Sequence, residues 1–296
     1  ASRFGSRWTY AGNGVAPGQM PAARMVDQFR FRTVGARTAL YGVVGDNVMH
    51  SASPAMHNAA CAAAELDAVY VPLRAADFAD FLAFADALGI AGASVTIPFK
   101  LDALNASVGA DDLTRRVGAA NTVRRAHRGQ EQSGRAQRGQ AQHGQAQHGQ
   151  AQRGQARGWE ATNTDVAGFL EPLGAAWGVD GVGADAQVRP RVSVLGAGGA
   201  ARAVIVALTS RDALVTVHAR RGEKAQALAA SLGVDAGPWP PAAGSWDLLV
   251  NCTPLGGASA PDESPLPGGP FDGRLVYDLT YRHGESPLVR EARRAG

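Results

Sequence analysis

The feature that most restricts the fold of this chain is a glycine-rich turn between a strand-like run and a helix-like stretch. Residues 191–195 are mostly apolar, residues 200–210 have helical spacing, and the string GAGGAA fills positions 196–201. A turn of this composition between a strand and a helix is typical of a dinucleotide-binding α/β domain. Small residues allow a tight turn and let phosphate approach the positively polarised helix start. We expect the cofactor to contact Gly196, Ala197, Gly198, Gly199 and Ala200.

The residues after the next expected strand, 213–218, distinguish between the two nicotinamide dinucleotides. A domain of this type that binds NAD places a carboxylate about 20 positions further on, where it binds the ribose 2′-hydroxyl. Here the strand is followed by Arg220 and Arg221, with Lys224 one turn later, and no carboxylate stands at the strand end. Cations suit a 2′-phosphate, and Arg presents paired donors to it. The sequence therefore favours NADP over NAD.

Short apolar runs alternate with helical patterns on both sides of this turn. Upstream we expect strands at 38–45, 68–74 and 92–98, helices at 53–67 and 77–89, and a hairpin of strands at 120–126 and 159–165. Further along we expect a linking helix at 166–178, a helix at 223–232 and strands at 247–253 and 274–281. Two such series in tandem predict an α/β fold with an N-terminal substrate-binding domain, a Rossmann-like domain and a ligand cleft between them.

Residues 129–158 differ from the rest of the chain in composition. They contain ten Gln and seven Gly and repeat a Gly-Gln-Ala-Gln pentapeptide that ends in His or Arg. Such a segment has too little apolar surface to offset its ordering entropy, so we expect a disordered insert at the hairpin tip. Seven Arg and one Glu give residues 124–158 a charge of +6, so the rest of the chain carries −3 of the total of +3. The basic charge of the whole chain therefore comes from this one segment and does not indicate a nucleic-acid-binding protein.

Length and composition exclude several other classes of protein. A chain of 296 residues has room for about two domains. Its two cysteines, Cys61 and Cys252, do not make a disulfide scaffold, and no apolar run approaches the ~18 residues of a membrane span. We expect a cytoplasmic protein that binds small molecules and holds no metal.

Two polar clusters at expected strand ends can carry chemistry. Ser53 precedes Pro54 at a predicted helix start, where we expect its side chain to cap the helix. Lys100 follows the strand at 92–98, and Asp165 is expected to end the second strand of the hairpin. Taken singly, each fits an ordinary surface charge. If they meet above the sheet edge, a lysine held by a carboxylate can donate and accept the proton that accompanies hydride transfer, so we expect both to be catalytic.

Seven strings occur in the order found in one family. They are YGVVGDNVMHSASPAMHN (41–58), SVTIPFK (94–100), GAANTV (118–123), NTDVAGF (163–169), GAGGAAR (196–202), NCTPLG (251–256) and DLTY (278–281). Together they resemble shikimate dehydrogenase from about Thr38 to the end of the chain. The resemblance implies NADP-dependent, reversible reduction of 3-dehydroshikimate to shikimate, a step of chorismate and aromatic amino-acid biosynthesis.

The resemblance also implies roles for individual residues. By motif position, the substrate carboxylate is bound by Ser51, Ser53 and Tyr281. The ring hydroxyls are held by Thr96, Lys100, Asn121 and Asp165, of which Lys100 and Asp165 also handle the proton. The 2′-phosphate is bound by Arg220 and Lys224, and Thr253 lies on the nicotinamide side. For Lys100 and Asp165 these roles agree with those argued above from the residues.

The two ends of the chain add further expectations. Residues 2–10 and 16–19 resemble the last strand and loop of a type I 3-dehydroquinate dehydratase barrel, an enzyme that some organisms fuse to shikimate dehydrogenase. We therefore expect the dehydrogenase part of a bifunctional protein, without dehydratase activity because the Schiff-base lysine is absent. At the other end, no counterpart of the family's Gln-containing helix follows residue 296, so we expect incomplete substrate contacts and doubtful activity in this chain alone.

These resemblances divide the chain into four parts. We expect a dehydratase remnant and linker at 1–37, a shikimate-binding catalytic domain at 38–178 that includes the insert, an NADP-binding domain at 188–281 and a truncated return helix at 282–296. Three alternatives stay open. The chain can be a quinate or quinate/shikimate dehydrogenase, or a non-catalytic NADP-binding homologue. It can also bind a polyanion through the basic insert, with steep salt dependence.

Overall fold

The computed structural model describes residues 3, 5–6, 9–12, 19–126, 158–177, 189–282 and 284–296. The chain forms two compact units, each built from separate stretches of sequence. Unit 1 takes Ala1–Ser94, Ala106–Ala110 and Val123–Ala161, and unit 2 takes Val95–Asn105, Asp111–Thr122 and Thr162–Gly296. Apart from Gly158, the predicted Gly/Gln insert lies outside the described residues.

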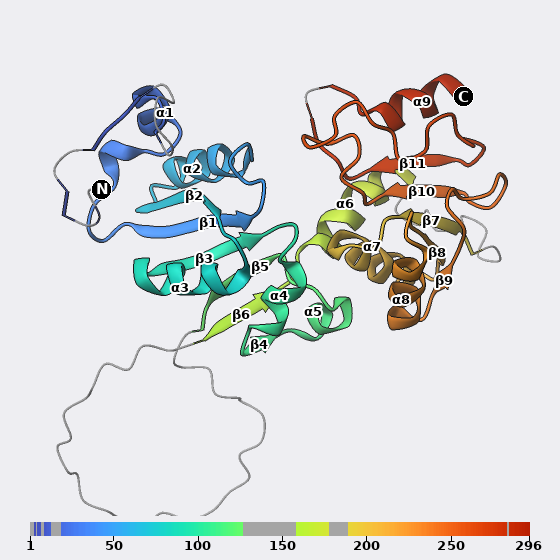
Figure 1. Cartoon of the computed structure of the whole chain (residues 1–296), viewed down its shortest axis with the longest axis horizontal. Coiled ribbons are helices and arrows are strands. Elements are labelled where there is room, and N and C mark those ends of the chain that lie inside the picture. The colour runs from blue at the N-terminus through green and yellow to red at the C-terminus, as the bar shows by residue number, and fades with distance from the viewer. Residues whose placement is uncertain are drawn as a thin grey trace, which may run out of the picture. The chain divides into compact units, whose positions relative to one another are not determined.

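Six strands form the first sheet, in the order β2-β1-β3-β5-β6-β4 (Figure 1). They are β1 (Ala39–Gly45), β2 (Ala68–Arg74), β3 (Ile90–Val95), β4 (Gly109–Ala110), β5 (Thr122–Arg125) and β6 (Trp159–Thr162). β1 pairs in parallel with β2 along its whole length. The N–H of Ala126 donates to the carbonyl of Gly158, and that of Asn121 to the carbonyl of Thr162, so β5 and β6 form the predicted hairpin.

Seven helices precede the second sheet in the part of the chain that the structure describes. They are α1 (Ala22–Asp27), the 3-10 helix η2 (Phe31–Thr33), α2 (Ser53–Ala63), α3 (Phe78–Leu88), α4 (Lys100–Asn105), α5 (Asp112–Val117) and α6 (Asp165–Trp177). α3 has clear end signals, because the carboxylate of Asp77 accepts from the N–H of Asp80 and Gly89 ends the helix with a φ of 61°. α1, η2, α4 and α5 were not predicted. η2 has three residues and the other three helices have six each.

The second sheet is parallel, with the strand order β11-β10-β7-β8-β9. Its strands are β7 (Arg191–Leu195), β8 (Leu214–His218), β9 (Asp235–Ala236), β10 (Leu248–Asn251) and β11 (Leu275–Asp278), and its helices are α7 (Gly199–Thr209), α8 (Gly222–Leu232) and α9 (Pro287–Ala295). β7 lies between β8 and β10, so the strand order reverses between β7 and β10. In such a sheet, ligands bind beside the carboxyl ends of the strands at this reversal.

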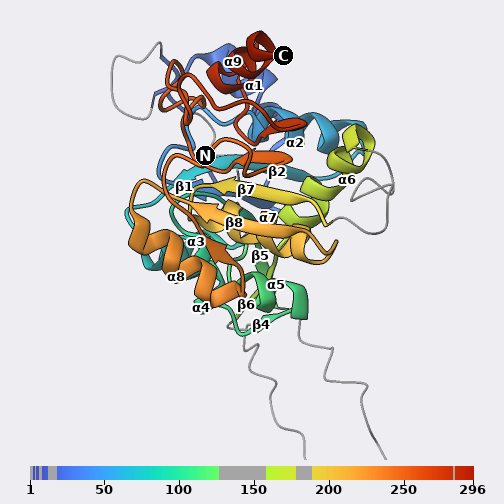
Figure 2. The same cartoon turned by 90° about the vertical axis from the view of Figure 1, so that its right-hand side faces the viewer.

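The core of unit 2 is built around α7, which Figure 2 shows beside β7 and β8. Ile205 and Leu208 on this helix are almost fully buried, together with Val194 on β7 and Leu248 on β10. Ala201 is also fully buried, as expected of a small residue that lets the helix pack closely against the strands. The α/β architecture predicted from the sequence is confirmed. None of the described helices is long and apolar enough to cross a membrane.

Candidate functional site

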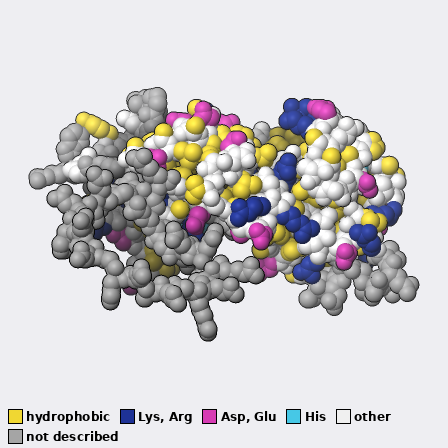
Figure 3. All heavy atoms as spheres, turned by 90° about the horizontal axis from the view of Figure 1, so that it is seen from below, with side chains coloured by type: hydrophobic (Ala, Val, Ile, Leu, Met, Phe, Trp, Pro, Cys, Tyr) yellow, Lys and Arg dark blue, Asp and Glu magenta, His cyan; other side chains and the backbone are white. Residues whose placement is uncertain are grey.

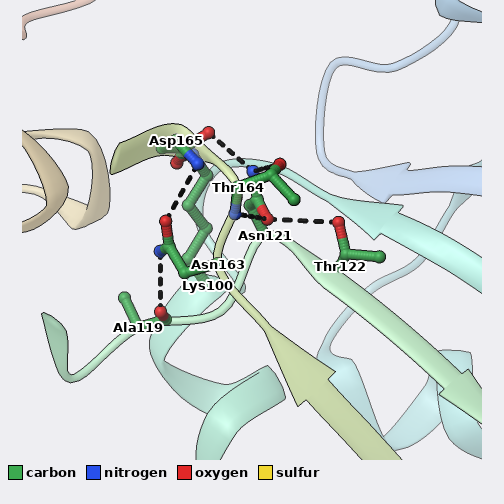
Figure 4. A network of polar contacts seen from close by, with 7 residues as sticks. All are labelled: Lys100, Ala119, Asn121, Thr122, Asn163, Thr164 and Asp165. Carbon is green, nitrogen blue, oxygen red and sulfur yellow. Dashed lines mark hydrogen bonds and ion pairs between the residues drawn. The ribbon is translucent and has the colours of Figure 1, made fainter. Parts of the chain in front are cut away.

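Lys100 and Asp165 meet in unit 2, each at the first residue of a helix (Figure 4). The Nζ atom of Lys100 lies 2.5 Å from Oδ2 of Asp165, and the two side chains are 14% and 30% exposed. The predicted contact is therefore confirmed. The predicted strand end is wrong, because the strand stops at Thr162 and Asp165 begins α6. A partly buried ammonium held by a carboxylate can deliver a proton to a ligand oxygen and take it back.

Asn121 fixes the other oxygen of the same carboxylate. Its Nδ2 donates to Oδ1 of Asp165 at 2.6 Å and to the hydroxyl of Thr164 at 2.8 Å. Its Oδ1 accepts from the N–H of Thr164 at 3.0 Å and from the hydroxyl of Thr122 at 3.1 Å. These donors and acceptors determine which way the amide points. Asn121 therefore orients the carboxylate of Asp165. The sequence resemblance described above also predicts that Asn121 contacts the substrate.

Asn163 is a member of this cluster that sequence reasoning did not assign. Its side chain is buried, and its Nδ2 donates to the carbonyl of Ala119 at 2.8 Å while its Oδ1 accepts from the N–H of Asp165 at 3.0 Å. A signal was present in the sequence. Residues 159–162 (WEAT) alternate apolar and polar, which predicts that position 163 continues the buried face of the strand. A buried amide there needs partners for both of its ends.

The glycine turn packs against the stem of Lys100. A Cβ atom at Gly199 would lie only 3.0 Å from Cβ and Cδ of Lys100. Gly196 has a φ of 107°, and a Cβ there would lie 3.2 Å from the backbone of Cys252 and from the side chain of Thr253. The turn, Lys100 and the loop after β10 therefore gather at the strand-order reversal, within one unit.

The turn has the properties of a phosphate-binding site. Gly198 precedes α7, no side chain caps that helix start, and a Cβ atom at Gly198 would meet nothing within 4 Å. Free N–H groups at a helix start and open space beside them suit an approaching phosphate. Arg220, Arg221 and Lys224 are exposed at the start of α8, as a 2′-phosphate would need. These residues fit the phosphate groups of NADP.

Thr253 is held by a hydrogen-bond network behind this turn. Its N–H and its hydroxyl donate to Oδ1 of Asn251, at 2.9 and 2.7 Å. Nδ2 of Asn251 donates to Oδ1 of Asp278 at 2.9 Å, and Oδ2 of Asp278 accepts from the hydroxyl of Ser286 at the start of α9. Burial raises the pKa of the Cys252 thiol, and the carboxylate of Asp278 raises it further. The hydrogen bonds of Asn251, Thr253 and Asp278 fix the loop after β10.

The remaining predicted substrate-binding residues are divided between the two units. Ser51 and Ser53 belong to unit 1, while Thr96 and Tyr281 belong to unit 2, where Thr96 is half-buried and Tyr281 is 74% exposed. The predicted helix cap at Ser53 is wrong. α2 begins at Ser53 itself, and Oγ of Ser51 accepts from the N–H of Ser53 at 3.2 Å.

The charged side chains of the described residues are mixed in sign. On the face shown in Figure 3, Lys and Arg side chains alternate with Asp and Glu and form no continuous basic surface among the residues drawn in colour. Within the described part of the chain, no three His, Cys, Asp or Glu side chains cluster as a metal site would require. Neither observation indicates a second candidate site among the described residues.

Comparisons with known proteins identify relatives that use NADP. Residues 43–123 match the family model of the shikimate dehydrogenase substrate binding domain. A shikimate dehydrogenase (NADP(+)) of an Anaeromyxobacter species is 36% identical in an alignment of 279 residues that covers 89% of this chain and 85% of that protein. The crystal structure of shikimate 5-dehydrogenase from Thermus thermophilus with NADP(H) and shikimate is 30% identical, with a TM-score of 0.65 over 87% of this chain and 85% of that one.

A longer relative aligns with the whole chain. It is the chloroplastic bifunctional 3-dehydroquinate dehydratase/shikimate dehydrogenase of Arabidopsis thaliana, which is 28% identical over 312 residues. The alignment covers 100% of this chain and 47% of that protein. It therefore includes the N-terminal residues that precede the seven family strings.

Proposed function

Because this chain belongs to the shikimate dehydrogenase family, we propose that Lys100 and Asp165 transfer the proton in its NADP-dependent interconversion of 3-dehydroshikimate and shikimate. The chain is an oxidoreductase that uses NADP. The observation that supports the two residue roles is the 2.5 Å contact between Lys100 and Asp165, beside a glycine turn that fits phosphate.

Reduction of a ketone to an alcohol needs a hydride at carbon and a proton at oxygen. The nicotinamide ring of NADPH supplies the hydride when it is bound. Lys100 donates a proton from Nζ to the carbonyl oxygen, and its positive charge stabilises the negative charge that develops there. Asp165 keeps the ammonium in place through Oδ2. In the reverse direction, Nζ of Lys100 accepts the hydroxyl proton, and the hydride that leaves the carbon would pass to NADP⁺.

The other residue roles complete this proposal. Ser51, Ser53 and Tyr281 bind the substrate carboxylate, while Thr96 and Asn121 hold ring hydroxyls together with Lys100 and Asp165. The cofactor pyrophosphate is bound by Gly196, Ala197, Gly198, Gly199 and Ala200, its 2′-phosphate by Arg220, Arg221 and Lys224, and Thr253 lines the nicotinamide side. Support comes from the open helix start at Gly198 and from the three exposed cations.

The substrate is tested by assaying the full-length protein with shikimate and with quinate, each against NADP⁺ and NAD⁺. We expect the highest kcat/KM with shikimate and NADP⁺. A higher value with quinate would establish the quinate dehydrogenase alternative. NADPH binding without turnover of either acid would establish the non-catalytic alternative.

The cofactor assignment has its own test. Arg220→Ala removes a charged donor from the 2′-phosphate, so NADPH should bind roughly 10- to 100-fold more weakly while NADH binding is unchanged. Fluorescence titration with each dinucleotide measures both constants. Equal losses for the two cofactors would remove Arg220 from this role.

We also propose that residues 1–37 continue from a 3-dehydroquinate dehydratase domain in a bifunctional protein. The support is the alignment with the Arabidopsis protein, which extends over these residues as well as over the dehydrogenase strings. The coding sequence upstream of Ala1 tests the proposal, because it should encode a barrel with a Schiff-base lysine. The expectation of a cytoplasmic protein stays a prediction.

A further inference from the structure

We infer that Asn163 is a positioning residue for the proposed proton transfer, because it connects the backbone around Lys100 and Asn121 to the first residue of α6. The inference rests on the proposed roles of Lys100 and Asp165. Figure 4 shows the side chain of Asn163 lying between Ala119 and Asp165. It has no place among the residues that contact substrate or cofactor in the proposal above.

The connection runs through both ends of one amide. Nδ2 of Asn163 donates to the carbonyl of Ala119 at 2.8 Å, and Oδ1 accepts from the N–H of Asp165 at 3.0 Å. Ala119 stands two residues before Asn121, and the N–H of Ala120 between them donates to the carbonyl of Lys100 at 2.7 Å. The amide therefore joins the segment that holds the lysine and Asn121 to the residue that supplies the carboxylate.

Few other side chains can make this connection. Aspartate has the same shape and can accept from the N–H of Asp165, but its second oxygen cannot donate to the carbonyl of Ala119. Serine is too short to reach both partners, and alanine makes neither bond. Because Asn163 is only 5% exposed, water has little access to the groups left unpaired.

Loss of the connection should reach the proton-transfer pair through the start of α6. Asp165 meets Nζ of Lys100 at 2.5 Å and Nδ2 of Asn121 at 2.6 Å. Contacts this short do not survive a displacement of the helix start by ~1 Å, and a misplacement of that size can lower a catalytic rate by roughly 10²-fold. The glycine turn makes no hydrogen bond to Asn163 among the described residues, so cofactor binding should be unaffected.

Unit 1 offers a matched control. Asn58 is also buried, at 2% exposed, and its amide also spans two backbone groups: Nδ2 donates to the carbonyl of Tyr70 at 2.7 Å and Oδ1 accepts from the N–H of Tyr70 at 2.8 Å. It joins α2 to β2 and belongs to a different unit from Lys100. Asn58→Ala therefore removes an equivalent pair of buried bonds away from the proton-transfer pair.

The experiment compares Asn163→Asp, Asn163→Ser, Asn58→Ala and Lys100→Ala with the wild-type full-length protein. For each we would measure Tm, NADPH affinity by fluorescence, and the pH profiles of kcat and KM for shikimate oxidation, well below the lowest Tm. We expect both Asn163 variants to lose roughly 10- to 100-fold in kcat, with a displaced pH profile and unchanged NADPH affinity. Asn58→Ala should lower Tm and leave kcat and its pH profile unchanged.

The outcomes separate this inference from the proposed function. An inactive wild-type protein, or a fully active Lys100→Ala, would overturn the proposed function. If instead Lys100→Ala is inactive while the Asn163 variants keep wild-type kcat and lose only Tm, as Asn58→Ala does, Asn163 is merely structural and the inference fails. NADPH affinity at the wild-type value shows that a slow variant is folded, so a loss of kcat in it reports on positioning.

Discussion

Two carboxylates in unit 2, Asp165 and Asp278, are both fully engaged but by different kinds of partner. Asp165 faces the ammonium of Lys100 on one oxygen and the amide of Asn121 on the other. Among the described residues, Asp278 accepts only from neutral groups: the amide of Asn251, the N–H and hydroxyl of Thr280, and the hydroxyl of Ser286.

The difference shows what separates a reacting carboxylate from a structural one. The carboxylate of Asp278 accepts more hydrogen bonds than that of Asp165, yet amides and hydroxyls carry no charge and are much weaker acids than an ammonium. The partner of Asp165 is an ammonium, which can lose its proton to a ligand and regain it. The chemical nature of the partner, and not the number of hydrogen bonds, therefore identifies the candidate catalytic group.

The largest expected effect comes from removing the ammonium. Lys100→Ala should lower kcat by roughly 10²- to 10⁴-fold and change KM much less, because proton transfer is lost while most binding contacts remain. Steady-state kinetics measure both constants. Lys100→Arg keeps the charge, but a guanidinium gives up a proton far less readily than an ammonium, so this variant should also be slow. A normal kcat in either variant would break the comparison.

A change at the structural carboxylate should reduce stability before it reduces the rate of chemistry. Asp278→Ala leaves the amide, N–H and hydroxyl donors around it without their acceptor, at a cost of about 1–3 kcal/mol in the free energy of unfolding. Urea unfolding measures this loss. Asp165→Asn is the reciprocal variant, with a small loss of stability and a large loss of kcat. The comparison fails if the two variants show the same pattern.

A substitution in the glycine turn should also disturb Lys100 and Asp165. It should leave the hydrogen bonds of Asp278 unchanged. Gly199→Ala places a methyl group 3.0 Å from the stem of Lys100 and forces the lysine to move, so kcat should fall by about tenfold. Gly168→Ala is the control, since a Cβ atom there meets nothing within 4 Å in α6. Kinetics and Tm of both variants test the prediction, and equal kcat values would contradict it.

The smallest expected effect is a pH dependence of stability caused by His218. Like Asp278, this titratable side chain has neutral groups as its hydrogen-bond partners. Its Nδ1 lies 2.7 Å from the carbonyl of Pro238 and its Nε2 lies 3.1 Å from the hydroxyl of Ser193. Burial lowers its pKa from 6.5. The unfolded chain therefore takes up the proton first, and stability should fall as pH drops below 6.5 until the folded pKa is reached.

Urea unfolding between pH 5 and 8, the range in which histidine ordinarily titrates, measures this dependence. His218→Gln keeps a polar side chain but cannot be protonated, so its stability should vary less with pH in that range. A variant with the same slope as the wild-type protein would show that another group is responsible.

Local sequence predicted the elements that have local causes. Asp77 and Gly89 delimit α3, and the small residues of the GAGGAA string determine the turn before α7. The six-residue helices α4 and α5 were missed because fewer than two turns give no hydrophobic period to detect. The end of β6 was misjudged because the apolar and polar alternation of residues 159–162 is followed by polar residues, with no Gly or Pro to mark the strand end.

The candidate site was predictable in its reacting groups and less so in what holds them. Lys100 and Asp165 stood out by residue type at expected strand ends and by their matched strings. The part played by Asn163 depends on the carbonyl of Ala119, which is 44 residues away in sequence. A single sequence without an alignment does not reveal such a pairing, because nothing near Asn163 specifies its distant acceptor.

The division of the chain into units has a consequence for how it can be cut. The backbone passes from one unit to the other five times, after residues 94, 105, 110, 122 and 161. No single scission of the polypeptide separates the two, and neither can be expressed as an uninterrupted gene fragment. After any one cut, at least one of the two fragments would therefore lack part of the unit that it mostly contains.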